Sequence, residues 1–343
     1  MDGLQTTSPF AIKVADALAG DPFTLIDVGC GGGIDLVWRE FGSNLRAIGF
    51  EPNLAECRRL AAGETHEGIR YEPAFVGLPP DHLFLARKAA NSPVVMNFWQ
   101  RCSAFRSCQI QQEKRKSEGQ ALNPYYYEGD GMADAADQIY LPDYFAKKNI
   151  GDIDFVKIDV DGPDFEVLVS LEDEFSKRNI LALGLEVSYF GTENDTNNTF
   201  HNTDRFMRQN GFELFGLSVR RYSAAALPGR YSLGIPAQGD FGRPIQGDAL
   251  YVRDLLSPRY EKERDRYDEE KLLKLACIFS LFNLPDNAAE ILVAFQARLK
   301  TRVDVEELLE VLARQAQAGR QKVLGYRDYM AAFERDDPMF YPR

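Results

Sequence analysis

The residues most able to do chemistry follow a short apolar run near the start of the chain. Asp27 ends this run, and the pattern GxGxG follows it at Gly29, Gly31 and Gly33. Cys30 lies inside the pattern. Glycine permits positive φ angles and lets a ligand touch bare backbone, and a helix that follows such a turn points its amide-rich end at the bound group. The pattern therefore predicts a cofactor site at this turn.

Two classes of ligand use a glycine turn of this kind. Dinucleotides require GxGxxG, but the last glycine position falls on Ile34 when counted from Gly29 and on Leu36 when counted from Gly31. An NAD-dependent oxidoreductase is therefore the weaker alternative. An acidic residue before GxGxG suits a ligand with a cationic amino-acid tail, which indicates S-adenosyl-L-methionine.

A second acidic residue ends the next apolar run. Glu51 follows the predicted strand Arg46–Phe50 and is itself followed by Pro52 and Asn53. A carboxylate at such a strand end can accept hydrogen bonds from both hydroxyls of a ribose. We therefore expect Glu51, Pro52 and Asn53 to bind the cofactor together with the glycine turn.

Further carboxylates end two later strands. Asp159 lies at the end of the predicted strand Phe155–Val160, and Glu186 lies at the end of Ile180–Val187. Methyl transfer to a hydroxyl needs a proton acceptor, and Asp159 and Glu186 are the candidate catalytic residues. Asp159 could instead position the cofactor. Together with Asp161, the same carboxylates could collect Mg²⁺, which prefers oxygen ligands.

These segments together resemble the FkbM family of class I S-adenosylmethionine-dependent methyltransferases. Besides the glycine turn, the resemblance rests on Phe50–Asn53, Asp154–Leu168 and Gly247–Arg253. It extends from about Thr24 to Arg253, roughly two-thirds of the chain. The sequence departs from the family pattern at Pro163, where the family often has histidine, and at Asp164, where it often has glutamate.

The resemblance implies an enzyme that methylates a hydroxyl oxygen of a sugar, a glycan or a small secondary metabolite. The alternative is a non-catalytic protein of the same fold that acts as a binding or scaffold protein. The complete set of Asp27, Gly29, Gly31 and Glu51 favours the enzyme, because an unused pocket need not keep all four residue types.

Apolar β-branched runs alternate with helical patterns as far as Arg253. Continuous apolar strands separated by helices predict a parallel sheet covered on both faces. We expect an α/β fold with a doubly wound, seven-stranded, mostly parallel, Rossmann-like sheet that closes on an antiparallel edge hairpin. The predicted strands are Thr24–Val28, Arg46–Phe50, Ile69–Val76, Phe155–Val160, Ile180–Val187, Phe212–Leu217 and Ala249–Arg253, and the predicted helices are Ile34–Phe41, Leu54–Ala62, Asp164–Phe175 and Phe200–Gln209.

The chain changes character near Pro258. All but two of its 27 glycines lie before this residue, and amphipathic helical patterns follow it. We therefore predict a methyltransferase domain over residues 1–257 and a C-terminal helical extension over 258–343, which could join two copies into a homo-oligomer. Two long segments, Leu78–Asp137 and Arg220–Gly247, are interpreted as lids over the site.

Composition narrows the partners. Lysine and arginine number 40 against 52 aspartates and glutamates, a net charge of −12, so we expect no binding to a nucleic-acid backbone. The apolar runs are far shorter than the roughly 20 residues of a membrane span. Five cysteines with no CxxC spacing indicate neither a disulfide framework nor a zinc site. A cytoplasmic enzyme acting on a small-molecule or glycan acceptor fits these features.

Overall fold

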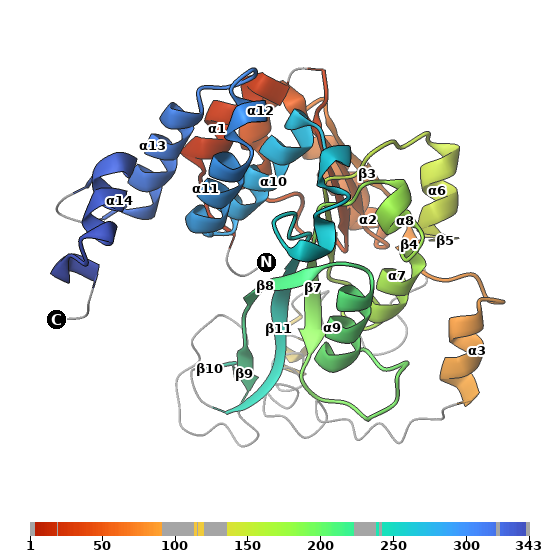
Figure 1. Cartoon of the computed structure of the whole chain (residues 1–343). Helices are drawn as coiled ribbons and strands as arrows, with labels where there is room; N and C mark the ends of the chain where they lie inside the picture. Colours follow the sequence, from red (N-terminus) through yellow and green to blue (C-terminus); the bar gives the residue numbers. More distant parts are fainter. Residues whose placement is uncertain are drawn as a thin grey trace.

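A central sheet forms the middle layer of the protein (Figure 1). The computed structural model describes residues 4–18, 20–90, 113–114, 116–119, 136–222, 238–239, 242–319 and 323–340. In these residues the strands follow the order β10-β9-β11-β7-β6-β1-β2-β3, and β8 pairs with β11. The strands are β1 Phe23–Val28, β2 Leu45–Phe50, β3 Ile69–Glu72, β6 Phe155–Ile158, β7 Ala182–Ser188, β8 Glu213–Leu217, β9 Arg220–Tyr222, β10 Gln238–Gly239 and β11 Arg243–Val252.

Strand directions confirm the predicted doubly wound α/β fold. The five strands β3, β2, β1, β6 and β7 are parallel to their neighbours. β11 is antiparallel to both β7 and β8, as the expected edge hairpin requires. The short strands β9 and β10 extend the sheet beyond the seven strands that the sequence indicates.

The predicted third strand, Ile69–Val76, is wrong in its second half. β3 ends at Glu72, and Pro73 follows it. Proline has no N–H to donate to a neighbouring strand, so the ladder stops there. Phe75–Val76 forms the separate strand β4, which pairs with β5 (Gln138–Ile139) in a small second sheet.

Two predicted helices also differ from the structure. The segment expected to be helical over Ile34–Phe41 is the 3₁₀ segment η2 (Leu36–Asn44), and Gly42 inside it has the non-helical angles φ 52° and ψ −135°. The expected helix Asp164–Phe175 is divided into α7 (Asp164–Ser170) and α8 (Glu174–Lys177). Helices α2 (Leu54–Gly63) and α9 (Phe200–Gln209) lie where the sequence predicts them.

Two hydrophobic clusters cover the two faces of the sheet. One contains residues of α1 (Pro9–Ala15), η2 and the C-terminal helices, and the other contains residues of α6 (Leu141–Lys147), α7 and α9. Figure 1 shows α1, α10, α11 and α13 on one side of the sheet and α6, α7 and α9 on the other. Both faces are therefore buried, which explains why the strands are apolar on both sides.

Helices follow Pro258, as expected. They are α10 (Glu269–Leu281), α11 (Pro285–Ala294), α12 (Gln296–Leu299), α13 (Val305–Ala316) and α14 (Tyr326–Glu334). α10 is buried on every side from Lys271 to Leu281. It is also tied to the sheet by charge, because Lys271 and Lys274 lie 2.6 and 3.2 Å from the carboxylate of the fully buried Asp154. A domain boundary at 257/258 stays a prediction.

Other segments bear on the predicted lids and on membrane insertion. α3 (Leu83–Ala90) opens the first predicted lid, but most of both predicted lids lies outside the described residues. Among the residues that the structure describes, no helix combines the length and apolar character needed to cross a bilayer.

Candidate active site

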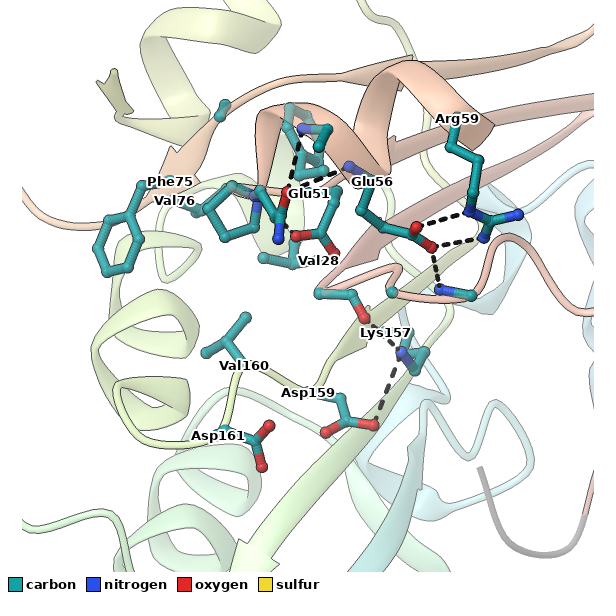
Figure 2. A pocket seen from close by; sticks show the side chains of 18 residues that line it. Val28, Glu51, Glu56, Arg59, Phe75, Val76, Lys157, Asp159, Val160 and Asp161 are labelled. Carbon is teal, nitrogen blue, oxygen red and sulfur yellow. Dashed lines mark hydrogen bonds and ion pairs between the residues drawn. The ribbon is translucent and has the colours of Figure 1, made fainter. Parts of the chain in front are cut away.

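A cavity of about 790 Å³ lies at the carboxyl ends of β1, β2 and β6. This is the edge of a parallel sheet at which ligands bind in doubly wound folds. Of the residues proposed from the sequence, the cavity is lined by Gly29, Gly31, Glu51, Pro52, Asn53 and Asp159. Figure 2 shows Glu51 facing Asp159 across this space, with Phe75 and Val76 at one end and the Glu56–Arg59 ion pair at the other.

Close backbone contacts shape the glycine turn. Gly29 has φ +85°, and a Cβ built on it would lie 1.8 Å from the Asp159 carbonyl oxygen. The N–H groups of Gly29 and Cys30 donate to the Phe50 carbonyl at 3.0 and 3.2 Å, which fixes the turn against β2. Within the described residues the Gly31 N–H makes no hydrogen bond, so it is available to a ligand in the cavity.

Cys30 and Gly33 do not line the cavity but support the turn. The Cys30 thiol is buried, and its pKa is raised by that burial. It fills the space above Gly49, where a Cβ would lie 2.6 Å from the Cys30 sulfur. Gly33 has φ +99° and donates its N–H to the Cys30 carbonyl at 2.8 Å. Direct contact of either residue with a cofactor stays a prediction.

Glu51 presents a carboxylate from the end of β2. Its side chain is largely buried, and this burial raises its pKa. One carboxylate oxygen accepts from the Asn53 N–H at 2.8 Å, while the other faces Gly31. Asn53 caps α2, since its side-chain oxygen accepts from the Ala55 and Glu56 N–H groups at 3.0 and 3.1 Å. Helix α2 therefore holds the loop that carries Glu51.

Asp27 lies below the cavity rather than in its wall. It is only 3% exposed, and its carboxylate oxygen lies 3.1 Å from the ammonium of Lys157. Lys157 also donates to the Gly29 carbonyl at 3.1 Å and lies 3.7 Å from the Asp159 carboxylate (Figure 2). Burial raises the pKa of Asp27, and Lys157 opposes that shift. The cation nearest to Asp27 is thus the chain's own lysine.

The loop that follows β6 is supported by Asp164. This carboxylate is buried and accepts from the Val160 and Gly162 N–H groups at 2.8 and 3.0 Å. The loop holds Asp161 at φ +55° at the cavity wall, next to Asp159. Burial raises the pKa of Asp161, and the neighbouring Asp159 adds to the shift. Asp164, at which the sequence departs from the family pattern, therefore positions the loop at the end of β6.

Glu186 is not among the residues that line the cavity. It is buried and pairs with Arg220 of β9 at 3.1 Å, and Arg220 also binds Asp248 of β11 at 2.9 Å. Burial, followed by the field of Asp159, raises the pKa of Glu186 to about 8. Arg220 makes the smaller, opposite contribution.

The structure does not support the Mg²⁺ site suggested from Asp159, Asp161 and Glu186. Among the described residues, no group of three or more histidine, cysteine, aspartate or glutamate side chains could hold a metal ion. Asp159 and Glu186 instead face the basic side chains Lys157 and Arg220. Each of these two carboxylates thus lies close to a cation of the chain itself.

Sequence reasoning overlooked three residues of this region. Lys157 lines the cavity from within the strand β6, and Arg220 binds Glu186, one of the two candidate bases. Phe75 closes one end of the cavity. The sequence could have indicated Lys157, because it lies two residues before Asp159 and residues two apart on a strand share a face.

The sheet order and the glycine turn define a class I methyltransferase fold. Within it, residues 105–214 match the family model described as the methyltransferase FkbM domain, which confirms the resemblance seen in the sequence over these residues. Over residues 105–214 the chain is thus similar to FkbM methyltransferase domains.

Solved structures that the chain resembles are distant in sequence. A magnesium protoporphyrin IX methyltransferase from Synechocystis with bound S-adenosylhomocysteine has 10% identity and a TM-score of 0.32, and the match covers 71% of this chain and 81% of that one. A precorrin-6y methyltransferase from Geobacter metallireducens has 10% identity and a TM-score of 0.31, with 71% and 86% covered. No curated protein matches this chain.

Proposed function

We propose that this protein transfers a methyl group from S-adenosyl-L-methionine to a hydroxyl oxygen of a small-molecule or glycan acceptor. The observation that carries the proposal is the Glu51 carboxylate beside Gly31 of the glycine turn, with both residues lining one cavity. The FkbM domain and the class I fold support the reaction type. The sugar, glycan or secondary-metabolite nature of the acceptor rests on the family resemblance.

The residues of the cavity fit this cofactor. Glu51 offers a carboxylate oxygen to the two ribose hydroxyls, and the Gly31 N–H is available to the carboxylate of the amino-acid tail. Phe75 and Val76 provide an apolar surface for the adenine ring. A side chain at Gly29 would clash with the Asp159 carbonyl, so the wall can be built only from bare backbone.

Asp27 acts indirectly in this proposal. Its carboxylate holds the Lys157 ammonium against the Gly29 carbonyl, and it thereby fixes the turn that receives the amino-acid tail. The amino group of that tail is then left to face backbone carbonyls and Asp159. Pro52 and Asn53 keep Glu51 in place at the start of α2.

The cofactor supplies an activated methyl group on a sulfonium, so the protein has to align the acceptor, exclude water and remove a proton. Asp159 is the better placed of the two candidate bases because it lines the cavity and its side chain is one-third exposed. Glu186 is buried, pairs with Arg220 and does not itself line the cavity. We assign proton acceptance to Asp159 and positioning to Glu186.

The reaction type is tested by incubating the full chain with methyl-labelled cofactor and a panel of candidate acceptors. We expect release of S-adenosylhomocysteine together with labelled carbohydrate or labelled small metabolite. Label found only in protein or RNA would overturn the acceptor class. Failure to bind S-adenosylhomocysteine at all would contradict the proposed cofactor and, with it, the proposed methyltransferase activity.

A further inference from the structure

We propose a second ligand site, for the phosphate group of a small molecule, at the amino ends of the strands that bear the cofactor cavity. It is a separate cavity of about 320 Å³ between the sheet and the loop Lys148–Asp152 that follows α6. None of its lining residues lines the cofactor cavity. The inference therefore does not rest on the proposed function.

Two arginines face this cavity from neighbouring strands. Arg70 of β3 lies opposite Ile48 of β2, and Arg46 lies two residues before Ile48. Since residues two apart on a strand point to the same face of a sheet, the two arginines lie on one face. Both side chains are exposed, so an anion from solvent can reach them.

Within the part of the chain that the structure describes, these two guanidinium groups have no counterion. Neither Arg46 nor Arg70 makes a hydrogen bond or ion pair with any residue that the structure describes, although the chain carries an excess of 12 negative charges. Glu72, two residues after Arg70, is already used by the Tyr144 hydroxyl at 2.8 Å and by Lys148 at 3.9 Å.

The two acidic residues of the cavity are already paired. Asp21 lies 2.7 Å from the Lys274 ammonium, and Asp152 lies 3.2 Å from that of Lys271. Asp152 also accepts from the Asn179 amide at 3.0 Å. Both carboxylates are thus paired with lysines of α10, which also pair with Asp154. The wall also contains Lys148, so three cationic side chains line the cavity against these two carboxylates.

The geometry points to a phosphate on a small carrier. Guanidinium groups offer planar pairs of N–H donors that match phosphate oxygens, and arginine is the residue that binds them with defined geometry. A volume of about 320 Å³ is at the lower end of the range for small-molecule pockets, too small for a dinucleotide. A sugar phosphate or free inorganic phosphate has the right charge and size.

The experiment is calorimetry of the full chain with inorganic phosphate, ribose 5-phosphate and ribose, each at one fixed low ionic strength. We expect saturable binding of the two phosphates and none of ribose. Arg46→Gln and Arg70→Gln should each weaken binding by about tenfold or more, because each removes a charge-assisted donor pair. Arg335→Gln, which alters an exposed arginine outside this cavity, should leave binding unchanged.

The outcomes separate the site from the proposed function. Tighter binding of ribose 5-phosphate assigns the site to an organic phosphate, and equal binding assigns it to free phosphate. No saturable binding of either phosphate, or equal binding in Arg46→Gln, Arg70→Gln and the wild-type protein, would overturn the proposal. Affinity for S-adenosylhomocysteine, measured on the same variants, should not change whichever result is obtained.

Discussion

Lys157 and Asp27 are 130 residues apart in the chain but face each other directly on the adjacent strands β6 and β1. The Lys157 ammonium lies 3.1 Å from the buried Asp27 carboxylate and equally close to the Gly29 carbonyl. Its pKa is raised, because the carboxylates of Asp27 and Asp159 outweigh the effect of burial, which acts in the opposite direction. One cation therefore joins the glycine turn to the strand that ends in the candidate base.

Replacing this lysine should destabilise the fold in a pH-dependent way. Lys157→Met leaves the Asp27 carboxylate buried without a partner, and we expect a loss of about 3 kcal/mol in the free energy of unfolding at pH 8. Without Lys157, burial keeps the pKa of Asp27 above its unfolded value. Folding then favours the protonated form, so the loss should shrink towards pH 5. Urea unfolding at the two pH values measures the difference.

The companion variant Lys157→Met/Asp27→Asn removes the uncompensated charge. It should recover much of the lost stability at pH 8, while Lys157→Met alone does not. An equal loss at pH 5 and pH 8 would show that the lysine contributes packing rather than charge compensation.

Two glycines of the turn form a matched pair. Gly29→Ala has to adopt φ +85° and places a Cβ 1.8 Å from the Asp159 carbonyl oxygen, whereas Gly32→Ala has to adopt φ +88° in open space. We expect Gly32→Ala to lose about 1 kcal/mol and Gly29→Ala about 3 kcal/mol or more, together with its affinity for S-adenosylhomocysteine. Chemical unfolding compares the two. Losses of the same size would contradict the close approach of β6 to the turn.

Replacing each of the two candidate bases should lower kcat to a different extent. With the acceptor that the labelling experiment identifies, Asp159→Asn should lower kcat by about 10²-fold or more, the usual contribution of a general base. Glu186→Gln should have the smaller effect, because Glu186 is paired with Arg220 outside the cavity lining. Initial rates of S-adenosylhomocysteine release at saturating cofactor measure both. A larger loss of kcat in Glu186→Gln would reverse the assignment.

Glu186 should also make the free energy of unfolding depend on pH. Its pKa is about 8 in the folded protein against an ordinary value of 4.5. Between these values the folded chain holds a proton that the unfolded chain has lost, so this group makes stability fall as pH rises. The free energy of unfolding of Glu186→Gln, relative to that of the wild type, should therefore increase from pH 5 to pH 8. A difference that does not vary with pH would show that Arg220 keeps Glu186 ionised throughout.

The sheet was predictable because its strands are apolar runs between turns, but local exceptions were not. Pro73 ends β3 inside a run that looks continuous in sequence, and Gly42 interrupts η2. Each is a change of backbone conformation at a single residue, which the pattern of hydrophobic residues does not indicate. α9, with a regular pattern and no such residue, has the predicted bounds.

The cavity was predictable in outline for a related reason. Gly29, Glu51 and Asp159 each directly follow a strand, and parallel strands bring those ends together. The pairing of Asp27 with Lys157 and of Glu186 with Arg220 depends on which strands are neighbours. That order is a property of the folded sheet, so the sequence could not show that both acidic residues are already paired.

The central claim is that the Glu51 carboxylate binds the ribose of the cofactor. Its most direct test is calorimetry of S-adenosylhomocysteine binding to the wild-type protein, to Glu51→Ala and to Glu67→Ala, an exposed glutamate that does not line the cavity. We expect Glu51→Ala to weaken binding by about tenfold or more, since hydrogen bonds to charged groups contribute about 1.5–3 kcal/mol, and Glu67→Ala to match the wild type. Unchanged affinity in Glu51→Ala would contradict the account.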